Sequence, residues 1–348
     1  MRDFLVKQRP ALVLAPMQNV TDLPFMRVCA RRGGPDWFVT EFFRIHSVAK
    51  LDPYILRSIN ENSTGKPVFA QIIGSDVESM ARAARELENH PIAGVDLNLG
   101  CPSPTVCGKS AGGGLLRQPA DIDRMVGSLR DAIRGRFTIK TRLGYHDPAE
   151  FSELLEVFRK HRIDGLTIHA RTVMDRYLTP VRPSGIRMAA ETLSCPVIAN
   201  GNVVNALAGK NFIARTNAHG LMIGRGAIRN PWIFDQIRAH YEGVPSIQPR
   251  AIDLLEYIED LYHELASESY DFDATKHVQR MKKTMMYIAQ GLGEDFEYHL
   301  RRVSQEAEFF TLCRTHLNHQ TPLIDIPPEK SKLFCGFQEL LEEENITP

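Results

Sequence analysis

The sequence contains few cysteines, and none of the six stands in a CxxC pair. Zinc and iron–sulfur sites are usually built from such pairs, so we expect free thiols and no metal. No apolar run approaches the roughly 20 residues that a membrane-spanning helix needs, and the N-terminus MRDFLVKQRP lacks the apolar core of a signal peptide. These absences favour a cytoplasmic protein without membrane contact.

A net charge is missing as well, since the 348 residues include 42 Lys and Arg and 42 Asp and Glu. The overall charge therefore does not point to a nucleic-acid partner, and such a partner would have to be held by a local basic patch. The chain is long enough for one large domain with an appendage or for two ordinary domains. We expect a globular, monomeric protein.

Eight short apolar runs recur along the chain at intervals that suit one strand and one helix. Between several of them, as at residues 76–90 and 119–133, apolar residues recur three and four apart, which is typical of helices that pack on a sheet. Because no GxGxxG motif follows the first run, the pattern favours an α/β fold of the TIM-barrel type over a doubly wound sheet. The runs begin at residues 11, 37, 67, 94, 137, 165, 196 and 220.

Polar side chains gather at the ends of these runs, where a TIM barrel carries its active site. A strand end that is only structural has no need of a buried amide, ammonium or imidazole group. Together they predict a polar site for a large ligand. The residues at these ends include Pro16, Met17, Glu41, Arg44, Gln71, Asn98, Cys101, Lys140, Arg142, His169, Arg171, Asn200, Gly201, Gly224 and Arg225.

The last two strand ends, in IANGNVV and MIGRGAI, place glycine between a strand and a helix. Backbone N–H groups can converge on a phosphate there, although tight turns alone would also explain the glycines. The other strand ends favour the phosphate of FMN, with Lys140 near the ring to stabilise the anionic reduced form. The residues expected to bind FMN are Pro16, Met17, Gln18, Gln71, Lys140, His169, Asn200, Gly201, Asn202, Gly224 and Arg225.

Taken as a set, these motifs resemble the flavin-dependent tRNA-dihydrouridine synthase family. The resemblance implies noncovalent FMN, NADPH or NADH as reductant, and a D-loop uridine of tRNA as substrate, which is reduced to 5,6-dihydrouridine. It also places Cys107 where the family usually has Asn, and Asn202 where an acidic residue is common. The motifs are APM (15–17), TEFFR (40–44), DLNLGCPS (96–103), AGGGLL (111–116), IKTRLG (139–144), TIHART (167–172), VIANG (197–201) and MIGRGA (222–227).

The resemblance implies a role for the thiol of Cys101. In the family, hydride passes from flavin N5 to C6 of uracil, and a proton must reach C5 from the other side of the ring. Cys101 is the predicted donor, because an ordinary thiol still holds its proton at pH 7. The alternative is that Cys101 is a small buried hydrophobe, and Cys107 is assigned no catalytic role. We expect residues 103–114 to close over the flipped base.

A boundary is predicted near residues 243–250, where one Gly and two Pro occur. Residues 1–245 would form the catalytic barrel, and residues 250–348 a helical tRNA-binding domain with helices over 253–269 and 274–289. In the second helix Val278, Met281, Met285 and Ile288 share one face, and Lys276, Arg280 and Lys283 share the opposite face. A basic stripe can be an ordinary solvated face, but beside a barrel that grips tRNA, phosphate contact is favoured.

The resemblance also suggests a branch of the family. HVQRMKKTMMYI (277–288), TEFFR and GRGAI (224–228) are most similar to the bacterial branch that modifies position 16 of tRNA. PWIF (231–234) is more like a sister branch, so positions 17 and 20 remain open. The expected RNA contacts are Arg44, Asn98, Tyr177, Arg280, Lys282 and Lys283.

Two other interpretations remain open at the level of the sequence. A flavin barrel could reduce or oxidise a free pyrimidine, as a dihydroorotate dehydrogenase-like enzyme does, but this leaves the basic helix without a role. A Schiff-base lyase that uses Lys140, or a barrel that binds RNA without catalysis, is the third. The lyase and the RNA-binding barrel would both be colourless, whereas a bound flavin absorbs visible light.

Overall fold

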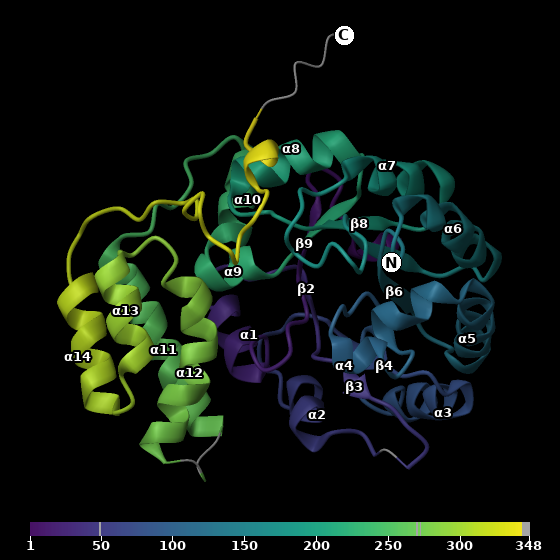
Figure 1. Cartoon of the computed structure of the whole chain (residues 1–348), viewed down its shortest axis with the longest axis horizontal. Coiled ribbons are helices and arrows are strands. Elements are labelled where there is room, and N and C mark those ends of the chain that lie inside the picture. The colour runs from purple at the N-terminus through teal and green to yellow at the C-terminus, as the bar shows by residue number, and fades with distance from the viewer. Residues whose placement is uncertain (49, 269–270, 272, 343–348) are drawn as a thin grey trace.

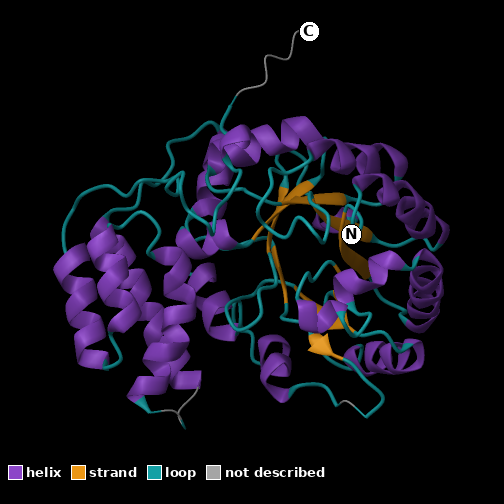
Figure 2. Ribbon diagram, in the orientation of Figure 1, coloured by secondary structure: helices purple, strands orange, loops and turns teal. Residues whose placement is uncertain are grey.

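The computed structural model describes residues 1–48, 50–268, 271 and 273–342, and its centre is a closed barrel of eight parallel strands (Figures 1 and 2). The first barrel strand pairs with both the second and the last, and the second pairs with the third, which closes the ring. The predicted TIM barrel is confirmed, with each predicted run in its strand. The strands are β1 (Ala11–Leu14), β2 (Trp37–Val39), β4 (Val68–Ile73), β5 (Gly94–Leu99), β6 (Phe137–Arg142), β7 (Gly165–His169), β8 (Val197–Asn200) and β9 (Gly220–Ile223).

A two-residue strand, β3 (Phe43–Arg44), continues beyond β2 and pairs with the end of β4. Around the barrel lie helices whose starts carry the expected signals, such as the side chains of Asp22 and Asp76, which accept hydrogen bonds from the first turns of α1 and α3. These helices are α1 (Leu23–Ala30), α2 (Pro53–Asn60), α3 (Val77–Leu87), α4 (Pro104–Cys107), α5 (Pro119–Ala132), α6 (Phe151–Lys160), α7 (Pro183–Thr192), α8 (Ala206–Thr216), α9 (Arg225–Arg229) and α10 (Ile233–Glu242).

Four helices pack beside the barrel, on the left in Figure 1, and α11 lies against α1. Ion pairs join these two helices, including Arg31 Nη1 to Glu264 Oε1 at 2.7 Å and Arg32 Nη2 to Asp260 Oδ2 at 2.7 Å. The two helices predicted here are confirmed to within two residues at each end. The helices are α11 (Ala251–Glu268), α12 (Ala274–Ile288), α13 (Glu294–Arg302) and α14 (Glu306–Leu317).

The apolar stripe predicted on α12 is buried, since Val278, Met281 and Met285 are fully inaccessible to solvent. Its neighbour Met286 is instead exposed. None of the helices in the described part of the chain combines the length and the hydropathy needed to cross a membrane.

After α14 the chain turns back to the barrel, which the sequence does not predict. The yellow segment of Figure 1 passes from α14 across α9 and ends beside α8. We call residues 331–342 the C-terminal strap. It buries Phe334, Phe337 and Leu340. The proposed division near 245–250 falls between α10 and α11, but the strap that follows belongs spatially to the barrel.

Candidate active site

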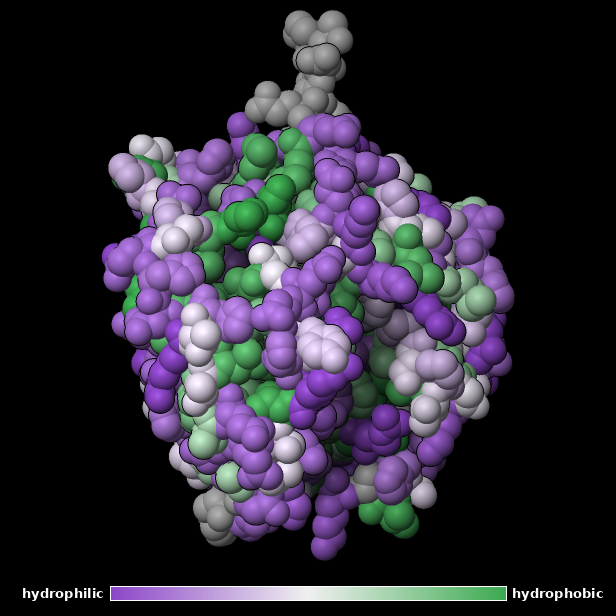
Figure 3. Space-filling model, turned by 60° about the vertical axis from the view of Figure 1, so that its left-hand side comes forward, coloured by the Kyte–Doolittle hydropathy of each residue, from purple (hydrophilic) through white to green (hydrophobic). Residues whose placement is uncertain are grey.

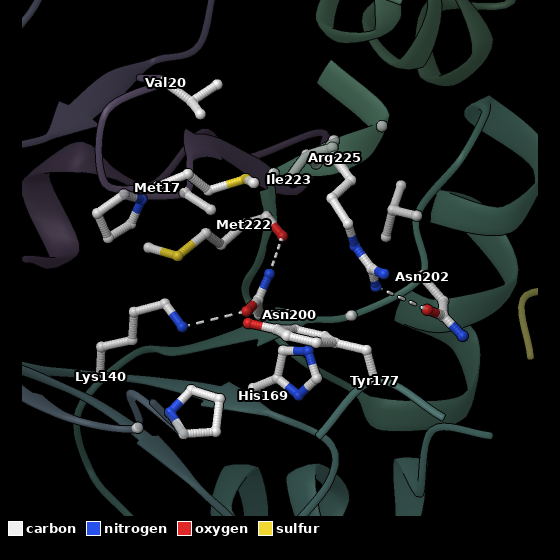
Figure 4. Close-up of a pocket in the computed structure, with 18 of the residues that line it drawn as sticks. Met17, Val20, Lys140, His169, Tyr177, Asn200, Asn202, Met222, Ile223 and Arg225 are labelled. Atoms are coloured by element: carbon white, nitrogen blue, oxygen red, sulfur yellow. Dashed lines mark hydrogen bonds between the residues drawn. The ribbon is translucent and has the colours of Figure 1, made fainter. Parts of the chain in front are cut away.

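A cavity of about 340 Å³ opens at the carboxyl ends of the barrel strands (Figure 4). All the residues predicted to bind the cofactor line it except Gln71. Two further groups of predicted residues reach it as well: Cys101, and the proposed RNA contacts Asn98 and Tyr177. The cofactor residues are Pro16, Met17, Gln18, Lys140, His169, Asn200, Gly201, Asn202, Gly224 and Arg225.

Gln71 does not line the cavity. Its side chain is fully buried, and both of its polar groups have protein partners. Nε2 donates to Asp96 Oδ2 at 2.7 Å, and Oε1 accepts from Asn98 Nδ2 at 2.8 Å. The structure therefore places Gln71 in support of Asn98 and not at the surface of the cavity.

Asn98 in turn holds the backbone that carries Cys101. Its Oδ1 accepts hydrogen bonds from the N–H groups of Gly100 and Cys101, each at 3.0 Å. On the inner side, Asp96 anchors this chain of contacts by accepting from Thr138 Oγ1 at 2.6 Å. The buried amides thus fix the turn after β5, where the thiol reaches the cavity.

Lys140 and Asn200 form a polar pair on the cavity wall. Lys140 Nζ donates to Asn200 Oδ1 at 3.2 Å, and Asn200 Nδ2 donates to the carbonyl oxygen of Met222 at 2.7 Å (Figure 4). Burial, together with the charge of Arg142, lowers the pKa of Lys140 to about 8. An anion beside this ammonium would favour its charged form.

His169 lies next to this pair, and burial lowers its pKa well below the ordinary value, with the charge of Arg142 acting in the same direction. It is therefore neutral at pH 7. Its Nδ1 is buried and has no hydrogen-bond partner among the described residues. Because buried polar atoms are normally paired, this nitrogen indicates a place for a ligand atom.

Positive charge dominates the cavity. Arg142 is buried near Lys140 and Arg225 is partly exposed, and their guanidinium groups lie 5.2 and 4.8 Å from the centre of the Tyr177 ring. Burial lowers the pKa of both arginines. No carboxylate lines the cavity among the residues that the structure describes. The site therefore suits an anionic ligand.

Two glycines after β8 and β9 keep the cavity open. Gly201 has a φ of +133°, and a Cβ on it would lie 2.9 Å from Val181 Cγ1. A Cβ on Gly224 would lie 3.1 Å from Met17 Sδ. Larger residues here would require the walls to move, which agrees with the predicted close approach of a ligand.

The glycine-rich segment after Cys101 is packed more tightly than expected. It contains the 3₁₀ helix η2 (Gly112–Arg117), and a Cβ on Gly113 would lie 2.8 Å from the carbonyl oxygen of Cys101. A Cβ on Gly114 would lie 2.7 Å from the carbonyl oxygen of Cys107. Close packing is thus one reason for these glycines, and closure of the segment over a base stays a prediction.

Cys107 is placed differently from Cys101. It is buried, it does not line the cavity, and its Sγ donates to the carbonyl oxygen of Cys101 at 3.4 Å. Burial raises the pKa of its thiol. Its position agrees with the absence of a predicted catalytic role.

Arg280 does not lie with the other cations of α12. Its guanidinium turns to the barrel, where Nη2 bonds to Asp22 Oδ2 at 2.7 Å. Tyr54 donates to the same carboxylate at 3.0 Å. Lys276 and Lys283 remain exposed, so the predicted stripe is divided because one of its members serves a buried acid.

A second buried acid lies beside this ion pair. Glu41 is 4% exposed, and its Oε1 accepts from the backbone N–H of Asn19, in the loop that supplies Met17 to the cavity. Burial and the nearby Asp22 raise the pKa of Glu41 to about 7. We call Asp22, Glu41 and Arg280 the acid junction, and sequence reasoning did not anticipate it.

The remaining predicted RNA contacts occupy the surface in different ways. Arg44 is exposed and lies over Phe42, which lines the cavity, at 5.6 Å from the ring centre. Lys282 Nζ donates to the carbonyl oxygens of Arg301 and Val303 at 2.7 and 2.9 Å and so caps α13. The face in Figure 3 is mostly hydrophilic, with hydrophobic side chains near its top and inside a hollow.

Several lining residues were missed by sequence reasoning. Phe42 stands within TEFFR and Tyr287 within HVQRMKKTMMYI, but Lys332, Leu333 and Phe334 come from the strap and belong to no recognised motif. Among the described residues, no group of three or more His, Cys, Asp or Glu side chains could hold a metal ion.

Comparison with protein families gives a match to the model described as "Dihydrouridine synthase (Dus)" over residues 13–321. A tRNA-dihydrouridine(16) synthase of Neisseria meningitidis is 35% identical over 247 residues, which are 69% of this chain and 74% of that protein. A tRNA-dihydrouridine synthase B of Pasteurella multocida is 30% identical over 273 residues, which are 77% of this chain and 82% of that protein.

Among solved structures, the old yellow enzyme homologue NCR of Zymomonas mobilis superimposes with a TM-score of 0.50. The match covers 68% of this chain and 90% of that chain at 12% sequence identity. At this identity the likeness supports the barrel fold alone.

Proposed function

The chain belongs to the dihydrouridine synthase family, and on that premise we propose that it reduces a uridine of tRNA to 5,6-dihydrouridine, with FMN as cofactor and NADPH as reductant. One observation carries the proposal: a single cavity brings the thiol of Cys101 together with Lys140, His169 and the two glycine turns after β8 and β9. An enzyme of this kind works in the cytoplasm, and we propose that it is a monomer.

The cavity fits a flavin mononucleotide in its chemistry. Nδ1 of His169, which has no partner among the described residues, and the ammonium of Lys140 would bond to heteroatoms of the ring, while Gly201, Gly224 and Arg225 would hold the phosphate. A bound flavin supplies the hydride that adds to C6 of the uracil. The excess of buried positive charge supports an anionic cofactor over a neutral one.

Cys101 is the proton donor in this proposal. Its thiol holds the proton that C5 of the uracil receives, and the bonds from Asn98 to the turn fix where that proton is presented. Asn98 also has a second amide hydrogen beyond the one given to Gln71, which could bond to the uracil. The base must leave its stack in the folded tRNA to reach this depth.

Position 16 is the proposed site of modification. The support is the resemblance of α12 and TEFFR to that branch and the name of the N. meningitidis relative. Relatives named synthase B match over a similar share of the chain, which keeps positions 17 and 20 as alternatives for the test. Membership of the family disfavours a free-pyrimidine substrate or a Schiff-base reaction at Lys140.

The experiment uses the purified protein and unmodified tRNA transcript. We expect a yellow protein whose FMN is bleached by NADPH or NADH and restored by tRNA but not by uridine or dihydroorotate. Mapping dihydrouridine in the product then identifies the position. A colourless protein, or one that free uridine reoxidises as fast as tRNA does, would overturn the proposal.

A further inference from the structure

The C-terminal strap lies beyond residue 321, where the match to the family ends, yet it reaches the cavity. Lys332, Leu333 and Phe334 are lining residues. They approach the cavity at the turns after β8 and β9, which is the end proposed for the phosphate. The strap is therefore a wall of the site that the family match does not include.

Backbone carbonyl groups of the strap bind the polar side chains at this end. Asn202 Nδ2 donates to the carbonyl oxygens of Cys335 and Gly336 at 3.0 and 2.5 Å, and Arg225 Nη1 donates to that of Leu333. The two side chains are also linked to each other, with Arg225 Nη2 at 3.5 Å from Asn202 Oδ1 (Figure 4). Their orientation thus depends on the strap.

The strap adds an aromatic contact to the same guanidinium group. Arg225 lies 5.7 Å from the ring centre of Phe334 and 4.8 Å from that of Tyr177. Arg171, behind it, donates from Nη2 to the carbonyl oxygen of Cys335 at 3.1 Å. Carbonyl groups and rings orient a guanidinium without cancelling its charge, so Arg225, which lines the cavity, remains available to attract an anion.

Tight packing holds the strap in place. Phe337 and Leu340 are buried, and Asn211 Nδ2 donates to the carbonyl oxygen of Leu340 at 2.9 Å. Gly336 has a φ of +69°, and a Cβ on it would lie 2.9 Å from the Cα of Pro180. The strap can therefore lie at this depth only with glycine at that position.

We propose that the C-terminal strap is part of the cofactor site, in which its carbonyl groups position Arg225 and Asn202 and its Lys332 adds a positive charge for the phosphate of FMN. The proposal rests on the proposed function because it takes FMN as the ligand. Lys332 is exposed at the rim, where its flexible side chain can reach an anion in the cavity.

The first test separates a charge effect from a structural effect by comparing FMN with riboflavin, which lacks the phosphate. For Lys332→Met we expect the affinity of the apoprotein for FMN to fall about fivefold or more, with riboflavin affinity unchanged, because one charge near a phosphate is lost. Lys330→Met is the control, since Lys330 is also exposed but does not line the cavity. Binding is followed by the quenching of flavin fluorescence.

The second test displaces the strap without changing a lining residue. Gly336→Ala introduces the Cβ that meets Pro180, and we expect FMN affinity to fall about tenfold, which corresponds to 1.4 kcal/mol. Gly243→Ala is matched to it, because Gly243 has a φ of +68° but nothing within 4 Å of an added Cβ. The control therefore carries the same backbone strain without the clash.

The outcomes distinguish the two proposals. If the wild-type protein binds neither FMN nor riboflavin, the proposed function fails. If it binds FMN but Lys332→Met matches Lys330→Met and Gly336→Ala matches Gly243→Ala, the strap is not part of the cofactor site. Equal losses for FMN and riboflavin in Lys332→Met would overturn the charge role.

Discussion

The cavity and the acid junction both bury charged side chains at the same end of the barrel, yet with opposite balance. In the cavity, Lys140 and Arg225 are only partly exposed, no carboxylate stands in the described lining, and partial burial lowers the pKa of each. In the junction, Arg280 is paired with Asp22 and acts on Glu41 by its charge, and burial raises the pKa of each acid.

The difference shows which charges serve a ligand and which serve the fold. Burying like charges together is costly unless a ligand of opposite sign completes the group, so the cavity is prepared for an anion. The junction is satisfied from within, because Arg280 of α12 neutralises acids at the base of the loop that supplies Met17. This ion pair therefore connects α12 to the loop that carries Met17 into the cavity.

The largest effect is expected at Cys101. Its replacement tests whether the positive charges of the cavity are enough for reduction of the uracil, or whether a proton donor is also needed. Cys101→Ala should still bind FMN and accept electrons from NADPH, because the cations remain. Reoxidation of the reduced flavin by tRNA should slow by about 10²- to 10⁴-fold, the usual contribution of a general acid. Stopped-flow absorbance on mixing with tRNA measures this rate.

Cys107→Ala is the matched control, since this thiol is six residues away and does not line the cavity. It should change the reoxidation rate far less. Equal losses in the two variants, or a near-normal rate in Cys101→Ala, would mean that another group supplies the proton.

The second prediction compares one cation from each region. Arg280→Met leaves the buried Asp22 without its ion pair, so the free energy of unfolding should fall by about 3–5 kcal/mol. Lys140→Met should instead leave the free energy of unfolding unchanged or raise it, while weakening FMN binding by about tenfold or more. Urea denaturation of the apoproteins and flavin titration give both quantities. If Arg280→Met and Lys140→Met lowered the free energy of unfolding equally, the proposed distinction between a charge that serves the fold and one that serves a ligand would be wrong.

Much of the cavity was predictable because strand ends in a parallel barrel meet at one edge. The recurring apolar runs predicted the position of each strand. Lys140, His169 and Asn200 were predicted to line the site because they stand at the ends of those runs. Gln71 shows the limit of this reasoning. It also lies near a strand end, but its side chain is fully buried, is held by Asp96 and Asn98, and does not line the cavity.

The acid junction and the strap were not predictable for a different reason. Arg280 has the spacing of a surface residue on α12, and only the packing of α12 against the barrel brings Asp22 to it. The strap contacts Arg225 from more than a hundred residues away, and although Arg225 stands within MIGRGA, no motif marks the strap. Such long-range contacts leave no periodic trace in the chain.

The third prediction concerns pH and the junction. The pKa of Glu41 rises from an ordinary 4.5 to about 7, so between these values the folded state holds a proton that the unfolded state has lost. Stability should therefore fall as the pH rises through this window. Glu41→Gln retains an acceptor for the N–H of Asn19 and removes the titration. At pH 8 it should raise the free energy of unfolding by about 1–3 kcal/mol, with little change at pH 5.

Denaturation curves at both pH values test this expectation. Glu150→Gln is a suitable comparison, because Glu150 is partly exposed at the end of a 3₁₀ helix (Pro148–Glu150) and also accepts hydrogen bonds from backbone N–H groups. It should not reproduce the gain at pH 8. A gain of the same size at both pH values in Glu41→Gln would show that ionisation of Glu41 is not the cause.

The smallest effect is expected on the outer surface of α12, where adjacent lysines have different surroundings. Lys283 is exposed, so Lys283→Ala should weaken tRNA binding only two- to fourfold and reduce the slope of log affinity against log salt by about 1. Lys282 caps α13 through two carbonyl oxygens, so Lys282→Ala should lower the free energy of unfolding by about 1 kcal/mol. Filter binding at several salt concentrations, beside denaturation of each variant, separates the two roles. If Lys283→Ala left the salt slope unchanged, the exposed face of α12 would be ordinary solvated surface, and contact with RNA would fall to Arg44 and the residues of the cavity.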